Sequence, residues 1–356
     1  MQNSIEIKKI IVAPLNWGLG HATRCIPIIL SSIENGYTPV IASDGDALQL
    51  LQKEFPDLEF IELPSYNIKY KKRLKIGLLL QFLKLRKAVK KEQELIADYV
   101  RENDVFGIVS DNRFGVRNGE IPCVYITHQI RVLSGITTIF TSKIHQRIIR
   151  KFDECWIPDV QEGLRLSGKL SEIKNLGINV KYLGILSRLK QEKRTFENSI
   201  LILLSGPEPQ RSMLEERLLV EFEKYQGKIV LVRGRIETSQ VKSQKENLLV
   251  YNYVLGDELQ ELIIRSELVL CRSGYSSILD LAKLGKKAFF IPTPNQTEQE
   301  YLAIYLESQR IVPYSKQGDF KLELLEKVKN YSGFQNVNNS EISSNLFNLF
   351  ERKRKG

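Results

Sequence analysis

The stretch from Cys271 to Ala303 constrains the fold more than any other part of the sequence. It predicts a buried strand, a turn of small residues, a helix, a second strand, and a polar loop that opens a second helix. Asp280 follows Gly274 by six residues, and Gln299 opens the second helix. This order suits a nucleoside diphosphate, because helix N-termini bind phosphate and a carboxylate binds ribose hydroxyls.

The same alternation of strands and helices runs twice along the 356 residues, which is long for a single core. We therefore expect an α/β protein with two tandem Rossmann-like, doubly wound parallel-sheet domains that face each other across a cleft. The polar stretch after a linker at 182–188 marks where the pattern restarts. The expected units are an N-terminal domain at 1–186, a C-terminal domain at 187–338, and a last helix at 339–356 that packs back towards the first domain.

Strands are expected at 8–15, 37–43, 58–63, 105–110, 123–127 and 154–157 in the first half. In the second half they are expected at 199–204, 228–232, 248–251, 268–271 and 288–291. The main helices are expected at 21–35, 76–101, 257–265, 275–284 and 298–308, with others from residue 46 and at 340–352.

The net charge of +10 is concentrated in one segment, residues 69–91, which holds ten Lys or Arg residues and no acid. An apolar stripe at helical spacing accompanies the charge, so the segment is either a solvated helix face or a contact for anionic lipid head groups. No nucleic-acid-binding motif accompanies it, and nucleic acid is not an expected partner.

The composition favours a cytoplasmic protein. The N-terminus is polar and lacks a signal-peptide apolar core, and no apolar run approaches the length of a bilayer span. None of the four cysteines has metal or redox spacing, so all are expected to be reduced and structural. They are Cys25, Cys123, Cys155 and Cys271.

The turn after the first strand contains Gly18 and Gly20, which bring backbone amides close to a ligand, followed by His21. A dinucleotide fingerprint would need a third glycine where Thr23 stands, so NAD is disfavoured. His21 opens a helix, and a helix N-terminus favours the neutral imidazole that a general base requires. His21 is therefore the first candidate for a catalytic base, with helix capping as its structural alternative.

Asp111 and His128 each end a predicted strand and are expected on the same sheet edge as His21. A catalytic role and a capping role are equally open for both of them. Asp44 and Asp46 resemble a metal-binding pair, but Asp46 reads better as an N-cap and Asp44 as a turn acid. No cluster has convincing metal spacing, and no metal or cofactor is expected.

In the second half, Ser205 and Gly206 follow the first strand and offer donors to a phosphate, unless they form an ordinary turn. Ser273 and Gly274 are stronger candidates because small residues there precede a good helix. Arg272 is expected either to face the phosphates or to pair with a carboxylate of its own domain.

These motifs resemble the glycosyltransferase family 28 group of GT-B glycosyltransferases, a group that includes an enzyme of peptidoglycan synthesis. The resemblance is clearest over residues 268–303, where the strand, the C-R-x-G turn, the acidic helix residue and the Q-x-Y helix start all have counterparts. It implies that Asp280 binds ribose and Gln299 the donor sugar, whereas Glu300 replaces a second glutamine of the family. The residues expected to bind a nucleotide-sugar are Gly18, Gly20, Ser205, Gly206, Arg272, Ser273, Gly274, Tyr275, Ser276, Asp280 and Gln299.

The G-x-G-H-x-x-R-C motif, residues 18–25, is also similar to the UDP-sugar hydrolase of pseudaminic acid synthesis, a GT-B protein that transfers its sugar to water. The resemblances together imply an inverting, metal-independent transferase that moves a hexose or N-acetylhexosamine from a UDP-sugar to a hydroxyl acceptor. That acceptor would be lipid-linked or part of a cell-envelope glycan, at the inner face of the plasma membrane. A UDP-sugar hydrolase and a non-catalytic nucleotide-sugar or lipid-binding protein are the alternatives.

Overall fold

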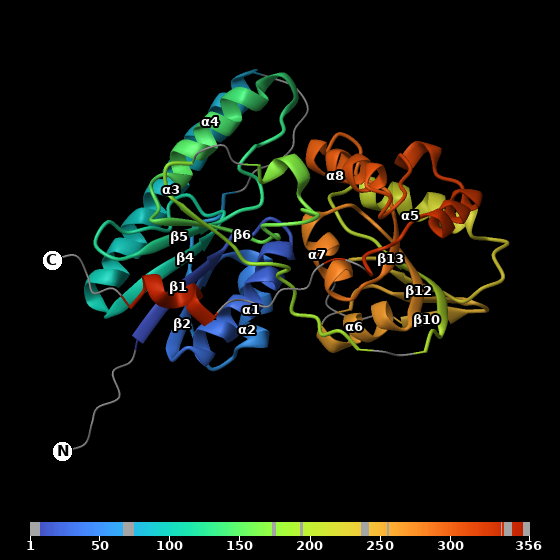
Figure 1. Cartoon of the computed structure of the whole chain (residues 1–356), viewed down its shortest axis with the longest axis horizontal. Helices are drawn as coiled ribbons and strands as arrows, with labels where there is room; N and C mark the ends of the chain where they lie inside the picture. Colours follow the sequence, from blue (N-terminus) through green and yellow to red (C-terminus); the bar gives the residue numbers. More distant parts are fainter. Residues whose placement is uncertain are drawn as a thin grey trace, which may run out of the picture.

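Two parallel-sheet units form the molecule (Figure 1). The computed structural model describes residues 8–66, 75–172, 176–192, 195–235, 242–254, 256–335, 337 and 344–351.

The first sheet has seven parallel strands in the order β3-β2-β1-β4-β5-β6-β7. Its centre is apolar on both faces, as a parallel sheet covered by helices requires. In β1, for example, residues 10–13 are all fully buried. The strands are β1 (Lys8–Pro14), β2 (Tyr37–Ser43), β3 (Glu59–Glu62), β4 (Val105–Asp111), β5 (Cys123–Ile126), β6 (Glu154–Ile157) and β7 (Asn179–Tyr182).

The helices of this unit cover the sheet with apolar faces at helical spacing. In α1, Ala22, Cys25, Ile26 and Ile29 all point inward. The helices are α1 (Gly20–Glu34), α2 (Gly45–Glu54), α3 (Lys75–Glu102) and α4 (Thr138–Ile149), with short 3-10 turns η1 (Gly135–Thr137) and η2 (Gly168–Leu170).

The second sheet has the order β10-β11-β9-β8-β12-β13. Five of its strands are parallel, and β10 pairs antiparallel with β11 at one edge. The strands are β8 (Asn198–Leu203), β9 (Ile229–Val232), β10 (Lys242–Lys245), β11 (Leu248–Tyr251), β12 (Ser266–Cys271) and β13 (Lys287–Phe290). The helices are α5 (Gln210–Glu221), α6 (Gly256–Ile264), α7 (Tyr275–Lys283) and α8 (Thr297–Ser308), followed by η3 (Gln317–Asp319) and η4 (Leu322–Asn330).

In each sheet the strand order reverses direction at the first strand of the unit. This switch point lies between β1 and β4 in the first sheet and between β8 and β12 in the second. Ligands of doubly wound sheets bind outside the carboxyl ends of the strands at such points. Helix α1 follows β1 and helix α7 follows β12, and the two helices pack against each other between the sheets (Figure 1). The expected fold class, two tandem Rossmann-like parallel-sheet domains, is confirmed.

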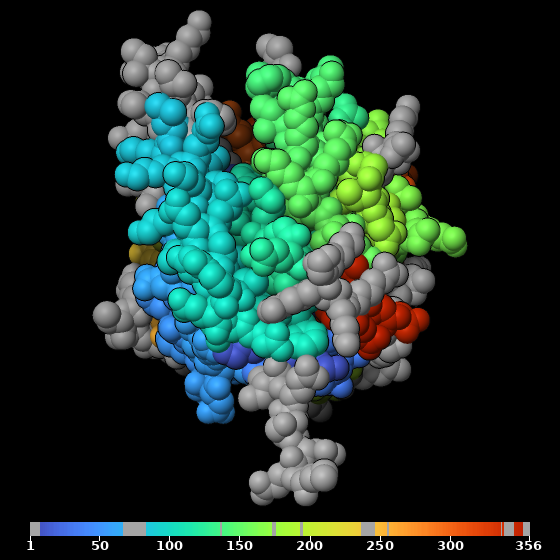
Figure 2. Space-filling view, turned by 90° about the vertical axis from the view of Figure 1, so that its left-hand side faces the viewer, coloured from blue at the N-terminus to red at the C-terminus, as the bar shows by residue number. Residues whose placement is uncertain are grey.

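The end of the chain returns to the first sheet as a 3-10 segment, η5 (Ser344–Leu349). Phe347 and Phe350 are buried beside Tyr37 and Trp156, and a side chain on Gly107 would collide with the Phe350 ring. Figure 2 shows this segment in red among the blue and green residues of the first half. The expected α-helix at 340–352 is therefore wrong in type over the described residues, although its expected direction of packing fits the observed contacts.

Four of the described α-helices and strands are absent from the expectations, namely α4, α5, β7 and β10, as are the 3-10 segments η1 to η4. Strand β7 is short and partly exposed, and β10 is an edge strand. Such elements show little of the alternation that identifies a strand. The four cysteines are buried and unpaired, as expected. None of the described helices combines the length and the apolar character that a bilayer span requires.

Candidate active site

His21 occupies the first turn of α1, immediately beyond the carboxyl end of β1. The turn at residues 15–19 adopts a compact shape, and Gly18 has a positive φ of 72° that favours glycine. No side chain caps the N-terminus of α1, and its first turn contains no acid. The positive end of the helix dipole therefore lies unopposed beside the imidazole.

Asp111 ends β4, the neighbour of β1, and is fully buried. Its Oδ1 lies 3.0 Å from Nδ1 of His21, and Nε of Arg24 donates to its Oδ2 at 2.5 Å. A second guanidinium nitrogen of Arg24 also contacts Oδ1. Burial is the largest single effect on Asp111 and opposes its ionisation, but the charges and hydrogen bonds of Arg24 and His21 together outweigh it and hold the pKa well below the ordinary value. Asp111 is therefore ionised, and because it is fully buried it cannot contact a bound substrate directly. Its position suits it to orient His21.

His21 remains neutral because burial, and then the charge of Arg24, lower its pKa below 6.5. Its Nδ1 lies 3.0 Å from Asp111 and 2.7 Å from Nη2 of Arg24. Arg24 Nη2 can only donate, so it competes with the Asp111 carboxylate for Nδ1; the tautomer that a general base requires is the one in which Nδ1–H donates to the carboxylate. Nε2 then carries the lone pair and has no partner among the described residues. The side chain is 15% exposed, so a ligand hydroxyl can reach that nitrogen.

His128 follows β5 and lies between the two units. Its ring stacks on Tyr275 with centroids 3.9 Å apart and an interplanar angle of 9°. Nε2 lies 2.8 Å from Oε1 of Glu298, and Nδ1 lies 3.4 Å from Nη1 of Arg24. Both ring nitrogens have protein partners, so His128 is a bridging group rather than an open base.

The N-terminus of α7 faces this cluster from the second unit. Gly274 is its N-cap, no side chain caps it, and its first turn contains no acid. A Cβ on Gly20 would lie 3.0 Å from Cβ of Ser276 in the first turn of α7. Two uncapped helix N-termini, those of α1 and α7, thus meet at one place, and their amides and dipoles favour an anion there.

Asp280 lies one turn further along α7 and faces the linker between the units. Ser187 donates a hydrogen bond of 2.5 Å to its Oδ1. Burial raises the pKa of this carboxyl to about 6, and the Ser187 hydrogen bond only partly offsets that effect. The free oxygen Oδ2 remains available to a ligand hydroxyl.

Three of the expected nucleotide-binding side chains point into the protein instead. Arg272 is 1% exposed and donates to the carbonyl oxygens of Ile291, Pro292 and Gln210 and to Oε1 of Gln317. It therefore meets neither a phosphate site nor a carboxylate, and both expectations for it are wrong. The Ser273 hydroxyl donates to the carbonyl of Gln299, and the Tyr275 hydroxyl donates to the carbonyl of Pro158.

Ser205 and Gly206 lie on an exposed turn before α5, and Gly206 has a positive φ of 98°. The N-terminus of α5 is already occupied, because Glu208 accepts from the backbone amide of Ser212 and also binds Arg211. This helix offers less to a phosphate than α7 does. Only the backbone and hydroxyl groups of the exposed turn itself remain as hydrogen-bond donors to a phosphate.

Gln299 and Glu300 brace the loop that precedes α8. Oε1 of Gln299 accepts from the amide of Thr293 at 2.8 Å, and Oε1 of Glu300 accepts from the amide of Asn295 at 3.0 Å. The amide nitrogen of Gln299 is the part of the side chain left for a sugar.

The acidic pair near α2 is arranged differently from the expectation. Asp44, not Asp46, is the N-cap residue, and its carboxylate binds Arg113 and Asn16. Arg113 also binds Glu92 in a fully buried ion pair. Among the described residues, no three His, Cys, Asp or Glu side chains lie close enough together to hold a metal ion.

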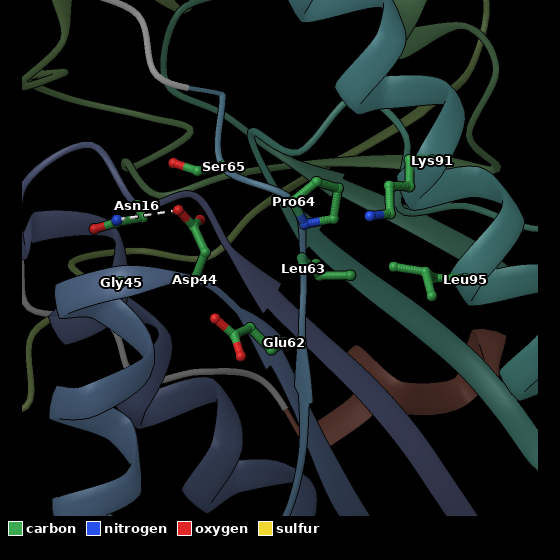
Figure 3. A pocket seen from close by; sticks show the side chains of 9 residues that line it. All are labelled: Asn16, Asp44, Gly45, Glu62, Leu63, Pro64, Ser65, Lys91 and Leu95. Atoms are coloured by element: carbon green, nitrogen blue, oxygen red, sulfur yellow. Dashed lines mark hydrogen bonds between the residues drawn. The ribbon is translucent and has the colours of Figure 1, made fainter.

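A polar pocket of about 460 Å³ opens at the same edge of the first sheet (Figure 3). Its base includes the fixed carboxylate of Asp44, and Figure 3 shows Lys91 across the pocket from it. One of its lining residues, Asn16, belongs to the turn between β1 and α1 that leads to His21. The lining residues are Asn16, Asp44, Gly45, Glu62, Leu63, Pro64, Ser65, Lys91 and Leu95.

The basic segment at residues 69–91 lies only partly within the described structure. Residues 67–74 and the side chains of 75–82 lie outside it. From Leu83 to Lys91, helix α3 exposes Leu83, Lys84, Arg86, Lys87, Lys90 and Lys91.

Comparison with solved structures identifies the architecture. CalG4, the calicheamicin glycosyltransferase, aligns with a TM-score of 0.66 and 10% identity, over 93% of this chain and 92% of its own. MurG of Acinetobacter baumannii aligns with a TM-score of 0.53 and 14% identity, over 91% and 90%. The chain has the GT-B fold.

Sequence comparison shows which family of glycosyltransferases the chain is similar to. Residues 209–351 match the glycosyltransferase family 28 C-terminal domain. A UDP-N-acetylglucosamine--N-acetylmuramyl-(pentapeptide) pyrophosphoryl-undecaprenol N-acetylglucosamine transferase of Haemophilus ducreyi is 25% identical over 57% of this chain, and the match spans about half of that relative, 56%. The enzyme of the same name from Actinobacillus pleuropneumoniae is 22% identical over 90% of this chain and 88% of its own. The resemblance to family 28 glycosyltransferases is thus confirmed.

Proposed function

We propose that the protein is an inverting glycosyltransferase that moves a hexose or N-acetylhexosamine from a UDP-sugar to a hydroxyl group, without a metal ion. The observation that carries the proposal is the pairing of His21 with Asp111 directly opposite the uncapped N-terminus of α7. One unit thus offers a base and the other a diphosphate site.

The donor binds the second unit in this proposal. Backbone amides at Gly274, Tyr275 and Ser276 receive the diphosphate, and Asp280 accepts hydrogen bonds from the ribose hydroxyls. Gln299 contacts the sugar. The family match over residues 209–351 and the donor named in the relatives' titles support a UDP-sugar.

The reaction is a single in-line displacement. The acceptor hydroxyl gives its proton to Nε2 of His21 while its oxygen forms a bond to the anomeric carbon. The bond from that carbon to the diphosphate oxygen breaks, and UDP leaves with the electron pair. Asp111 stabilises the imidazolium that forms, and the dipoles of α1 and α7 stabilise the departing charge.

The acceptor binds the first unit. The pocket beside Asn16 and Asp44 has the mixture of carboxylate, amide, hydroxyl and ammonium groups that a carbohydrate needs. The exposed cations of α3 suit an anionic membrane surface, which would place a lipid-linked acceptor near His21. The relatives' titles name a pyrophosphoryl-undecaprenol acceptor, and we propose an acceptor of this lipid-linked kind at the inner face of the plasma membrane.

A UDP-sugar hydrolase is the second candidate, because residues of the motif that resembles such a hydrolase lie together around Asp111. Arg24 and Cys25 both contact Asp111, so the motif residues form one cluster around the base. The similarity to named transferases along 90% of the chain supports transfer over hydrolysis.

A thermal-shift screen across nucleoside diphosphates and their sugars tests the donor class. A selective rise with UDP compounds is expected, and equal rises with ADP, GDP and UDP would refute the donor assignment. UDP release from UDP-sugars without an acceptor then separates a hydrolase from a transferase. Binding of UDP with no turnover in the presence of lipid-linked acceptors would indicate a non-catalytic protein.

A further inference from the structure

Glu298 belongs to the second unit, yet it contacts the hydrogen-bonded cluster that surrounds the base of the first. We infer that Glu298 is a positioning residue for His21, acting through His128 and Arg24, so that the base is held in its reactive orientation only when the two units touch. The inference rests on the proposed function, in which His21 is the base.

The contacts form an unbroken chain across the boundary between the units. Oε1 of Glu298, in the first turn of α8, lies 2.8 Å from Nε2 of His128. Nδ1 of His128 lies 3.4 Å from Nη1 of Arg24, whose other nitrogens hold Asp111. Asp111 in turn accepts from Nδ1 of His21 at 3.0 Å.

Packing leaves His128 a single orientation. Its ring lies flat on Tyr275 of α7, and the Tyr275 hydroxyl is itself tied to the carbonyl of Pro158 at 2.7 Å. Two of the three groups that fix the imidazole, Tyr275 and Glu298, therefore come from the second unit. Separation of the units would free His128 and remove its support from Arg24.

Charge balance points the same way. Arg24 is buried, and Asp111 is the carboxylate that pairs with it directly. Glu298 supplies a second carboxylate at the other end of this series of hydrogen bonds, where its side chain is 34% exposed. Buried cations need such paired partners. Glu298 also precedes Gln299, the residue proposed to contact the donor sugar, so donor binding and base orientation share one helical turn.

Three variants separate this role from simple docking of the units. Glu298→Ala removes the carboxylate that accepts the hydrogen bond from Nε2–H of His128. Glu298→Gln retains an amide oxygen that can accept the same hydrogen bond. Thr297→Ala is the matched control, because the neighbouring Thr297 hydroxyl also bridges the units, donating to the carbonyl of Leu133 at 2.7 Å, but it touches no member of the chain.

Nitrogen-15 spectra of the three histidines provide a readout that needs no activity. In the parent protein we expect the ring proton of His128 on Nε2 and that of His21 on Nδ1. Glu298→Ala should change the signals of both residues and leave those of His145 unchanged, whereas Thr297→Ala should change neither. If His21 does not respond to Glu298→Ala, the inference is overturned whether or not a substrate is known.

Turnover of a UDP-sugar then tests the catalytic consequence. Glu298→Ala should lower kcat by roughly 10-fold or more, with the Kd for UDP within twofold of the parent, because the loss is one of orientation. Glu298→Gln should stay within about threefold of the parent. Equal losses in Glu298→Ala and Thr297→Ala would show that only docking matters. Failure of all proteins to turn over any UDP-sugar would refute the proposed function but would leave the spectroscopic result standing.

Discussion

Replacement of His21 is the decisive perturbation of the proposed chemistry. General-base catalysis contributes roughly 10²- to 10⁴-fold, so His21→Ala should lower kcat by at least about 10²-fold, or about 2.7 kcal/mol of transition-state stabilisation. The Kd for UDP should remain within about twofold, because the proposed donor contacts lie on the other unit. Steady-state release of UDP in the presence of the acceptor, together with calorimetric UDP binding, measures both quantities.

The pH profile sharpens the test. A base acts in its neutral form, and burial and Arg24 lower the pKa of His21 below 6.5. The parent kcat at saturating UDP-sugar, where the titration of Asp280 in the donor site no longer limits binding, should therefore fall as the pH drops through that lowered pKa of His21. His21→Ala should lose this acidic limb.

His145 provides the matched control. It is a buried histidine that binds the Tyr125 hydroxyl and the Gln129 carbonyl and has no hydrogen bond to His21, Arg24 or Asp111. His145→Gln should lower the Tm and leave the pH profile unchanged. Turnover of His21→Ala within threefold of the parent would refute the assignment of the base.

Four further predictions follow from packing and burial. The folded-state pKa of Asp280, about 6, lies above the ordinary 3.8, so burial of this carboxyl destabilises the folded protein as the pH rises from about 4 through 6. Asp280→Asn should therefore raise the Tm at pH 8, by an amount equivalent to about 1–3 kcal/mol, but not at pH 4. Equal Tm changes at both pH values would contradict this. Asp280→Ala should weaken UDP binding in calorimetry, and unchanged binding would remove Asp280 from the ribose site. Gly20→Ala would press its methyl group on Ser276, so turnover should drop while the Tm of each unit changes little, and parent-like kcat would argue against close approach of α1 and α7 during turnover. Phe350→Ala should cost about 3–5 kcal/mol in denaturant unfolding, because the ring fills the space above Gly107, and a loss below 1 kcal/mol would show that the terminal segment is not docked.

The fold was predictable because its central strands are continuous apolar runs. Strands such as β2 and β6 begin and end where the sequence indicates, since buried parallel strands need apolar residues on both faces. Helix α4 was not predictable from periodicity, because Ile139 and Phe140 are exposed and blur its apolar face.

The first-unit half of the site was also predictable. His21 and Asp111 follow β1 and β4, which are neighbours in the sheet, so their side chains meet at its edge. Arg24 was missed, although it lies one helical turn after His21 and could have been found by that spacing. Its contact with Asp111 decides which form of His21 prevails.

The remaining residues depend on tertiary contacts that a sequence does not reveal. The contact of Glu298 with His128 joins residues 170 positions apart and exists only because the two units dock. Arg272 stands beside a glycine turn in the sequence, but its side chain turns inward to four oxygen acceptors. Direction of a long side chain is set by the cavity around it rather than by its neighbours in the chain.

The return of the chain to its starting sheet has a mechanical consequence. The polypeptide crosses from one half to the other near residue 186 and crosses back after residue 337, and Phe347 and Phe350 anchor the second crossing. The second half is therefore joined to the first at both of its ends in the sequence. Because both connections limit how far the halves can separate, we expect His128 and Tyr275 to regain the same stacked contact after each separation.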